Sequence, residues 1–461
     1  MTVTEQYRNM SEFPFQLSIR CSHPEKRTES ITCTALLRSV PGRRNVFDAL
    51  WNNRNLIVKV FTHKLSAKRH LKREWKGLTA LSNKKINAPQ PLFFGQTQAG
   101  DWVITEEKIT CSSTALESFH NYQENTKKLE LLDMICRELA FQHKSGVLQK
   151  DLHLDNFILA EEKIYTLDPA QMQFYKYQVP KKKSISNLAM LLLYLPDDDI
   201  QSKNILCKEY FQSRGWQYGT QQEQYVQKQI TLQRNRGINR GMKKCLRTSK
   251  RVIRIRNNGI TAVFDRSFCS EDDFPAFIHQ IDNIMTKGDI LKNGNTCFVS
   301  HLTWNKNEIV IKRYNYKGFI YSLRHSLISS RARKGWLHAH RLTMLGIPTP
   351  KPLAYIELHN GLVVLHSYFI TEFVEGTNLH YFLKDQSISE NQHNSAQKQL
   401  EIILDKMREF HITHGDLKHS NILIAKNGPV LTDLDAMKVH KSRFFYKLRR
   451  AKDIERFNNS D

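Results

Sequence analysis

Acidic and amide side chains near residues 151–168 have a spacing that suits phosphoryl transfer. Asp151 and Asn156 stand five positions apart, and Asp168 follows twelve positions after Asn156. Transfer of a γ-phosphoryl group depends on positioning and charge neutralisation more than on covalent chemistry. An Asp in a tight loop can accept the proton of an incoming hydroxyl, while an Asn and a second Asp offer the hard oxygen ligands that Mg²⁺ prefers.

The same pattern returns near the C-terminus at Asp416, Asn421 and Asp433, with identical inner spacings. Both copies read Asp-Leu-x-x-x-Asn, followed by two short apolar strands with a turn between them and then the last Asp. Asp and Asn are common in turns, so one copy alone would be weak evidence. Because the order and spacing recur, we interpret both segments as site motifs.

Each copy also has one lysine on a short β-branched strand upstream. Lys59 lies in residues 56–61, and Lys312 lies in residues 309–314. A strand lysine can hold the α- and β-phosphates of a nucleotide, and a Glu on the next helix can orient it. Glu74 has that place in the first copy, whereas Gly335 aligns with it in the second. Lys312 therefore needs a carboxylate from elsewhere in the fold, or the second copy binds nucleotide unusually, or it is inactive.

The elements that must position these residues follow the same order in both copies. The pattern predicts strands, a helix, a strand pair and a second helix, in this order, before each Asp loop. In the first copy these elements span 30–61, 65–82, 92–106 and 126–144. In the second copy they span 295–313, 330–345, 352–374 and 395–411. Trp75 recurs as Trp336, and both are expected to be core anchors of the first helix. We therefore predict an α+β protein with two tandem domains, 1–255 and 285–461, joined by a connecting segment at 256–284. Few residues follow Asp433, so the second domain should have a minimal C-terminal lobe.

Composition sets limits on the class of protein. The 461 residues include 69 Lys+Arg and 45 Asp+Glu, a formal net charge of +24, and 40% are hydrophobic, which excludes a disordered chain. No run approaches the roughly 20 apolar residues of a membrane-spanning helix, and the first residues do not resemble a secretory signal. The eight cysteines form no Cys-x-x-Cys pair, which is typical of reduced thiols. We expect a cytoplasmic protein.

The positive charge is concentrated in two stretches without any acid. Residues 234–256 carry ten Lys and Arg, and the second acid-free stretch spans 309–356. A run of charge is usually a solvated face, but so many like charges repel one another unless an anion lies opposite. The candidate anions are a membrane surface, a phosphorylated glycolipid and nucleic acid.

Several segments resemble the protein-kinase-like superfamily, and more closely its lipopolysaccharide kinase branch. They are residues 72–75 (KREW), 330–336 (SRARKGW), 345–352 (LGIPTPKP), 414–421 (HGDLKHSN) and 431–437 (LTDLDAM). The resemblance covers roughly 30–250 and 285–455 and implies two bilobal kinase-like domains. It also implies transfer of phosphate from ATP, with Mg²⁺, to a sugar of the lipopolysaccharide inner core.

The resemblance assigns a role to each residue of the two motifs. The catalytic-loop Asp corresponds to Asp151 and Asp416, and the metal ligands correspond to Asn156, Asp168, Asn421 and Asp433. The phosphate-binding lysine corresponds to Lys59 and Lys312, with Glu74 as the helix partner in the first copy. Neither copy has a Gly-x-Gly-x-x-Gly loop, and the first has Gln149 where the family has His. Because copy one keeps every direct ligand, it has a modest edge as the catalyst.

The sequence therefore predicts an ATP-dependent kinase of a lipopolysaccharide-core sugar. Its substrate would be an anionic glycolipid at the cytoplasmic leaflet, which the protein would contact peripherally at the inner face of the inner membrane. A pair of inactive kinase-like domains that scaffold envelope glycolipid assembly is one alternative. An atypical RIO-like protein kinase acting near RNA is another, since residues 167–171 (LDPAQ) faintly resemble the metal motif of such enzymes.

Overall fold

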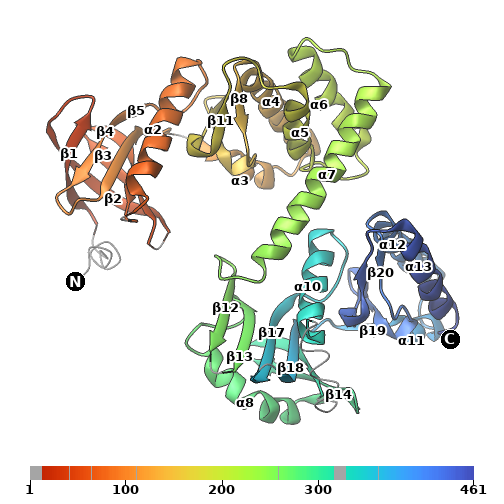
Figure 1. The fold of residues 1–461 in the computed structure, drawn as a ribbon. Helices are drawn as coiled ribbons and strands as arrows, with labels where there is room; N and C mark the ends of the chain where they lie inside the picture. Colours follow the sequence, from red (N-terminus) through yellow and green to blue (C-terminus); the bar gives the residue numbers. More distant parts are fainter. Residues whose placement is uncertain are drawn as a thin grey trace. The chain divides into compact units, whose positions relative to one another are not determined.

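The computed structural model describes residues 13–40, 42–63, 65–110, 112–257, 259–315, 329–361 and 363–460. The chain divides into two compact units, Met1–Arg234 and Asn235–Asp461 (Figure 1). Each unit combines a strand-rich part with a helical part, so the predicted α+β class is confirmed. Among the described residues, no helix is long and apolar enough to cross a membrane.

The first unit begins with a closed barrel whose strand order is β1-β2-β3-β4-β6-β5. Its strands are β1 (Phe15–His23), β2 (Thr28–Val40), β3 (Arg44–Trp51), β4 (Arg54–Phe61), β5 (Pro91–Thr97) and β6 (Trp102–Glu107). In β4, Leu56, Val58 and Val60 are buried in the barrel, so the alternating Lys59 points to the other face. Helix α2 (Ala67–Asn83) packs on that face through Leu71 and Leu78.

The helical part of the first unit holds the Asp151 motif in short strands and turns. Its helices are α3 (Ala115–Asn121), α4 (Asn125–Lys144), α5 (Lys181–Leu192), α6 (Ile200–Ser213) and α7 (Thr220–Lys244), the last of which crosses the unit boundary. Its short strands are β7 (Ser112–Thr114), β8 (Val147–Gln149), β9 (Phe157–Ala160), β10 (Lys163–Thr166) and β11 (Met172–Phe174). A core of Leu131, Leu139, Leu188 and Phe211 joins α4, α5 and α6 beneath these strands.

The second unit is built on a seven-stranded sheet with the order β12-β13-β17-β18-β16-β15-β14. The strands are β12 (Val252–Asn257), β13 (Ile260–Asp265), β14 (Asp289–Gly294), β15 (Cys297–Trp304), β16 (Asn307–Tyr314), β17 (Pro352–Asn360) and β18 (Val363–Glu372). All pairings are antiparallel, and Lys312 on β16 stands opposite Phe369 on β18. Helix α10 (Arg331–Met344) packs against β17 and β18.

The segment 256–284, expected to connect two domains, is part of the second unit. Residues 260–265 form β13, which pairs with β17, and helix α8 (Phe274–Lys287) packs on the sheet through Phe274 and Phe277. The prediction missed these elements because they lie outside the repeated pattern. Their apolar side chains nevertheless need a sheet face to cover.

The helical part of the second unit is small. It contains β19 (Gly376–Asn378), α11 (Leu379–Lys384), α12 (Glu390–Glu409), β20 (Ile412–Thr413), β21 (Ile422–Ala425), β22 (Gly428–Leu431), β23 (Lys438–Val439) and α13 (Arg443–Asn458). Single turns at η3 (His419–Asn421) and η4 (Leu434–Ala436) follow the Asp416 loop and Asp433 respectively.

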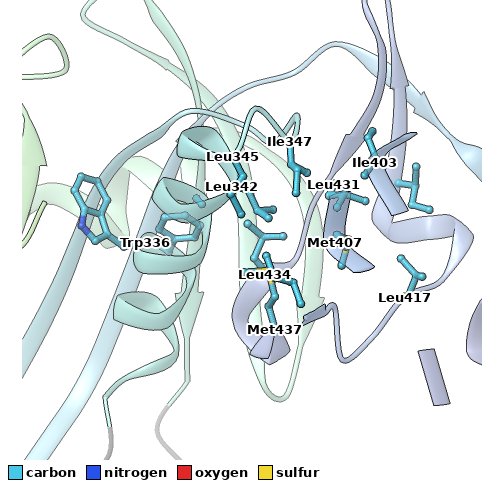
Figure 2. Packing of buried hydrophobic residues seen from close by; sticks show 14 of the residues in the cluster. Trp336, Leu342, Leu345, Ile347, Ile403, Met407, Leu417, Leu431, Leu434 and Met437 are labelled. Carbon is cyan, nitrogen blue, oxygen red and sulfur yellow. The ribbon is translucent and has the colours of Figure 1, made fainter. Parts of the chain in front are cut away.

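Helix α10 joins the sheet to the loop after Asp433. Leu342 of this helix and Leu345, the residue just after it, face Leu434 and Met437, as Figure 2 shows, and Met407 of α12 completes the contact. On the other side of α10, Trp336 is fully buried and its Nε1 donates a hydrogen bond to the carbonyl of Cys245, 3.0 Å away. Trp336 is therefore the expected core anchor. Trp75 is only half-buried and packs on His23 and Phe94.

Replacing Trp336 by Ala should lower the free energy of unfolding of the second unit by about 3–5 kcal/mol, because it removes a fully buried aromatic side chain. Hydrogen exchange of α10 and α12 under increasing urea would measure the loss. Trp75→Ala, at a half-buried site in the first unit, is the matched control and should cost less. A Trp336→Ala loss below that of Trp75→Ala would contradict the assignment of Trp336 as a core anchor.

Candidate functional site

The Asp416 loop is fixed by the last helix of the chain. The Asp453 carboxylate of α13 accepts hydrogen bonds from the backbone N–H groups of His414 (2.7 Å) and Gly415 (2.9 Å). His414 is buried, and its Nε2 lies 2.9 Å from the carbonyl oxygen of Thr432. Gly415 has φ of +82°, and a Cβ there would lie 2.4 Å from the Ala436 carbonyl oxygen, so only glycine fits. The loop is thereby tied to the strand that leads to Asp433.

The side chain of Asn421 is held by Asp416. Its Nδ2 donates to the Asp416 carbonyl oxygen at 2.8 Å and to Asp416 Oδ2 at 3.0 Å. Because both contacts use the amide nitrogen, the side-chain oxygen of Asn421 is left to serve as a metal ligand. Asp433 adopts the left-handed conformation with φ of +57° just after β22. Its counterpart Asp168 has φ of +54° in the first unit.

Lys312 finds its carboxylate partners on the loop after β22. Its Nζ forms an ion pair with Asp433 and lies 3.8 Å from Asp435 Oδ1. Arg331 of α10 donates from Nε to Asp435 Oδ2 at 2.6 Å. A Cβ on Gly335 would lie 2.9 Å from Phe369 Cδ1, so this position has no room for a glutamate. The missing helix Glu is thus replaced by Asp435, with an arginine on the helix.

The two acids beside Lys312 have opposite pKa shifts. Burial, followed by the hydrogen bond with Asp433, raises the pKa of Asp435 to about 6. Burial would also raise the pKa of Asp433, but the hydrogen bond with Asp435 and the Lys312 ammonium outweigh it and hold that pKa well below its ordinary value. The negative charge of the pair is therefore concentrated on Asp433, where a metal ligand needs it.

A cavity of about 470 Å³ opens between the sheet and the Asp433 loop. Its polar end carries Lys312, Asn421 and Asp433, and its apolar walls include Val299, Val310, Phe369, Leu423 and Leu434. Its volume and mixed lining are typical of a small-molecule site. The side chains predicted to bind phosphate and metal therefore lie around one space.

A second cavity, of about 780 Å³, contains Asp416 itself. Lys418 and Ser420 line both cavities, so the two adjoin at the Asp416 loop. Lys452, Arg456 and His380 give this second space a basic lining, with Tyr381 beside them.

The first unit brings Lys59 and Glu74 together, with Lys59 Nζ 2.8 Å from Glu74 Oε1. A third residue, Glu106 at the end of β6, also lies 2.8 Å from Lys59 Nζ. The side chains of Glu74 and Glu106 are nearly inaccessible to solvent. Burial raises the pKa of Glu106, and the two carboxylates raise the pKa of Lys59 even though burial opposes this. The ammonium of Lys59 is held between two acids.

The rest of the first motif matches the second in part. Asn156 Nδ2 donates to the Asp151 carbonyl oxygen at 2.9 Å, and Asp168 Oδ2 accepts from Gln171 at 3.2 Å. Gln149 is buried where His414 lies in the second unit, and its Nε2 donates to Gln142 Oε1 at 3.0 Å. Lys59 is paired with Glu74 and Glu106, whereas its counterpart Lys312 is paired with Asp433.

Four residues of these sites were missed from the sequence: Glu106, Arg331, Asp435 and Asp453. Asp435 had a signal, since it follows Asp433 by two positions in the recognised 431–437 segment. Asp453 and Glu106 had none, because each acts on residues tens of positions away.

The donor set of the second unit fits Mg²⁺. An amide oxygen and a carboxylate line the same cavity, and Mg²⁺ usually takes one or two protein oxygens and completes its shell with phosphate and water. Within the described residues there is no group of three or more His, Cys, Asp or Glu able to hold a metal by themselves.

Comparison with known proteins identifies part of the chain. Residues 287–460 match the model of the lipopolysaccharide kinase (Kdo/WaaP) family, whereas a search of curated proteins found no match. The match covers β15, β16 and α10, the Asp416 loop, Asp433 and α13. The resemblance suggested by the sequence is confirmed over this range, where residues 287–460 are similar to the lipopolysaccharide kinase family.

Proposed function

We propose that the second unit transfers the γ-phosphate of ATP to a sugar hydroxyl of the lipopolysaccharide inner core. The observation that carries the proposal is the arrangement of two adjoining cavities about one loop. Lys312, Asn421 and Asp433 line one cavity, and Asp416 lines the other. This arrangement lies within the range that matches the lipopolysaccharide kinase family.

Each side chain has a role that its position supports. Lys312 binds the α- and β-phosphates, and Asn421 and Asp433 hold Mg²⁺, which supplies neutralisation of the phosphate charge. Asp416 accepts the proton of the acceptor hydroxyl from the second cavity. Binding of phosphate oxygens at Lys312 would take over part of its pairing with Asp433, which frees that carboxylate for the metal. Asp435 and Arg331 hold Lys312 and the Asp433 loop in position while phosphate oxygens replace Asp433 at the lysine.

The acceptor chemistry follows from the lining of the second cavity. Lys418, Lys452 and Arg456 line the cavity that contains Asp416. An inner-core sugar linked to phosphorylated lipid A carries several negative charges, which basic side chains of this kind attract. We accordingly place the protein at the inner face of the inner membrane, in peripheral contact with the cytoplasmic leaflet.

The first unit is proposed to be a non-catalytic companion. Glu106 lies two residues after Ile104, the residue that pairs with Lys59 across the strands. Thr371 has the equivalent position in the second unit, two residues after Phe369, which pairs with Lys312. A second carboxylate at this point repels nucleotide phosphates and competes for the ammonium. This proposal puts catalysis in the second unit, whereas the sequence analysis assigned a modest edge to the first unit.

Asp416→Asn in the full chain should lower phosphate transfer by about 10²–10⁴-fold, because the general base is lost while the shape of the loop is kept. Mass spectrometry of the purified glycolipid would measure the product, together with ATP turnover. The same change at Asp151 is the matched comparison, for which we expect a loss of less than about threefold. Unchanged core phosphate in the Asp416→Asn variant would overturn the proposed function.

The charge at position 371 should control nucleotide binding. Thr371→Glu places a carboxylate near Lys312, as Glu106 does at Lys59, and should weaken ATP binding by about tenfold or more relative to Thr371→Gln. Isothermal titration calorimetry with ATP and Mg²⁺ would give both dissociation constants. Gln has nearly the shape of Glu without its charge. Equal affinities in the two variants would show that Glu106 is not what closes the first site.

A further inference from the structure

Helix α13, the dark blue helix next to the C-terminus in Figure 1, has one side buried and another that exposes large apolar residues. Tyr446 and Asp453 are the buried residues of the helix. Phe444, Phe445 and Leu448 are 66%, 62% and 52% exposed. We call these three residues the α13 apolar patch. Two adjacent phenylalanines and a leucine on neighbouring turns are more than the scattered single apolar residues of an ordinary surface.

Positive charge surrounds the α13 apolar patch. Residues 436–452 contain no acid and seven basic residues: Lys438, Lys441, Arg443, Lys447, Arg449, Arg450 and Lys452. At about 100° per residue, Lys447 and Arg449 lie on either side of the patch around the helix. A helix with an apolar stripe between basic flanks is typical of segments that lie in the interface of a bilayer.

The same face of α13 leads to the catalytic cavity. Positions 445, 448, 452, 456 and 459 follow one another at intervals of three or four and therefore share one side of the helix. Lys452, Arg456 and Asn459 line the cavity that contains Asp416. The N-terminal half of this face carries Phe445 and Leu448, and the C-terminal half borders the site.

We propose that the α13 apolar patch and its basic flanks dock on an anionic lipid bilayer and hold the Asp416 cavity at the membrane surface. The idea of a lipid-anchored acceptor rests on the proposed function, but the docking surface rests on α13 alone. Apolar side chains would enter the headgroup region, and Lys and Arg would pair with lipid phosphates. A second copy of the chain is a poorer occupant, because a two-fold contact through this face would bring the two basic flanks together.

The test measures binding of the full chain to vesicles by sedimentation. Vesicles of phosphatidylcholine mixed with phosphatidylglycerol should bind the protein more tightly than phosphatidylcholine alone, and salt should weaken the binding. The triple variant Phe444→Ser, Phe445→Ser, Leu448→Ser should bind the anionic vesicles about tenfold less or weaker still. Ile402→Ser is the matched control, since Ile402 is 58% exposed on α12. It should bind like the unchanged chain.

A second readout reports where the helix lies. Phe445→Trp should show a blue-shifted fluorescence component that brominated lipids quench when anionic vesicles are added. Full vesicle binding by the triple variant, or a tryptophan at 445 that stays in water, would overturn the docking surface. So would dimerisation through α13 in place of vesicle binding.

The two proposals fail in different ways. The triple variant should keep ATP turnover with a soluble, delipidated core oligosaccharide, because its changes lie outside both cavities. If Asp416→Asn leaves that turnover unchanged while vesicle binding depends on the patch, the kinase assignment is wrong and the docking surface stands. If turnover depends on Asp416 and the triple variant binds vesicles like the unchanged chain, only the docking surface is wrong.

Discussion

Two carboxylates and two cations hold the second unit's site together. Lys312 comes from β16, Arg331 comes from α10, and Asp433 and Asp435 come from the loop after β22. Two partly buried acids this close would repel each other without cations between them. Because each cation belongs to a different element, the ion pairs between the cations and the acids fix the strand, the helix and the loop relative to one another. The packing of Leu342 and Leu345 on Leu434 and Met437 excludes water from the same junction.

The first unit joins the corresponding loop and helix by different contacts. Its loop has Ala170 where Asp435 lies, and its helix has the glutamate that the second unit lacks. Gly77 of α2 meets Pro169 so closely that a Cβ there would lie 2.8 Å from the proline Cβ. Helix and loop therefore meet by close packing rather than by an ion pair. Glu106 is the second carboxylate that pairs with Lys59. In the second unit, Thr371 lines the cavity that contains Lys312.

The tertiary structure pairs part of the excess positive charge with acids of the same chain. Acids remote in sequence pair with members of both acid-free stretches: Asp265 with Arg251, and Asp282 with Arg313. Residues 316–328 of the second stretch lie outside the described residues. The expectation of an anion opposite each stretch is thus met in part by the protein itself. Residues 436–452 contain no acid, and most of their basic side chains are exposed on α13 and just before it.

Much of the fold and half of the site could be read from the sequence, for a physical reason. The helix and strand periods, the recurrence of Asp, Asn and Asp, and the strand lysines are local patterns, and local patterns depend on neighbouring residues. They predicted the order of the elements, and they singled out Lys312, Asn421 and Asp433, which line the cavity of the second unit. The strands and helix within 256–284 were missed because they belong to no repeat.

What only the tertiary structure decided are contacts between residues far apart in the chain. Asp453 reaches back to His414 and Gly415, Asp435 replaces a helix glutamate for Lys312, and Glu106 joins Lys59. Such partners are selected by three-dimensional proximity and by the cost of leaving a buried charge unpaired, which no spacing in the sequence reveals. The sequence predicted which residues could do the chemistry. The fold decided which lysine opens on a cavity and which is enclosed by acids.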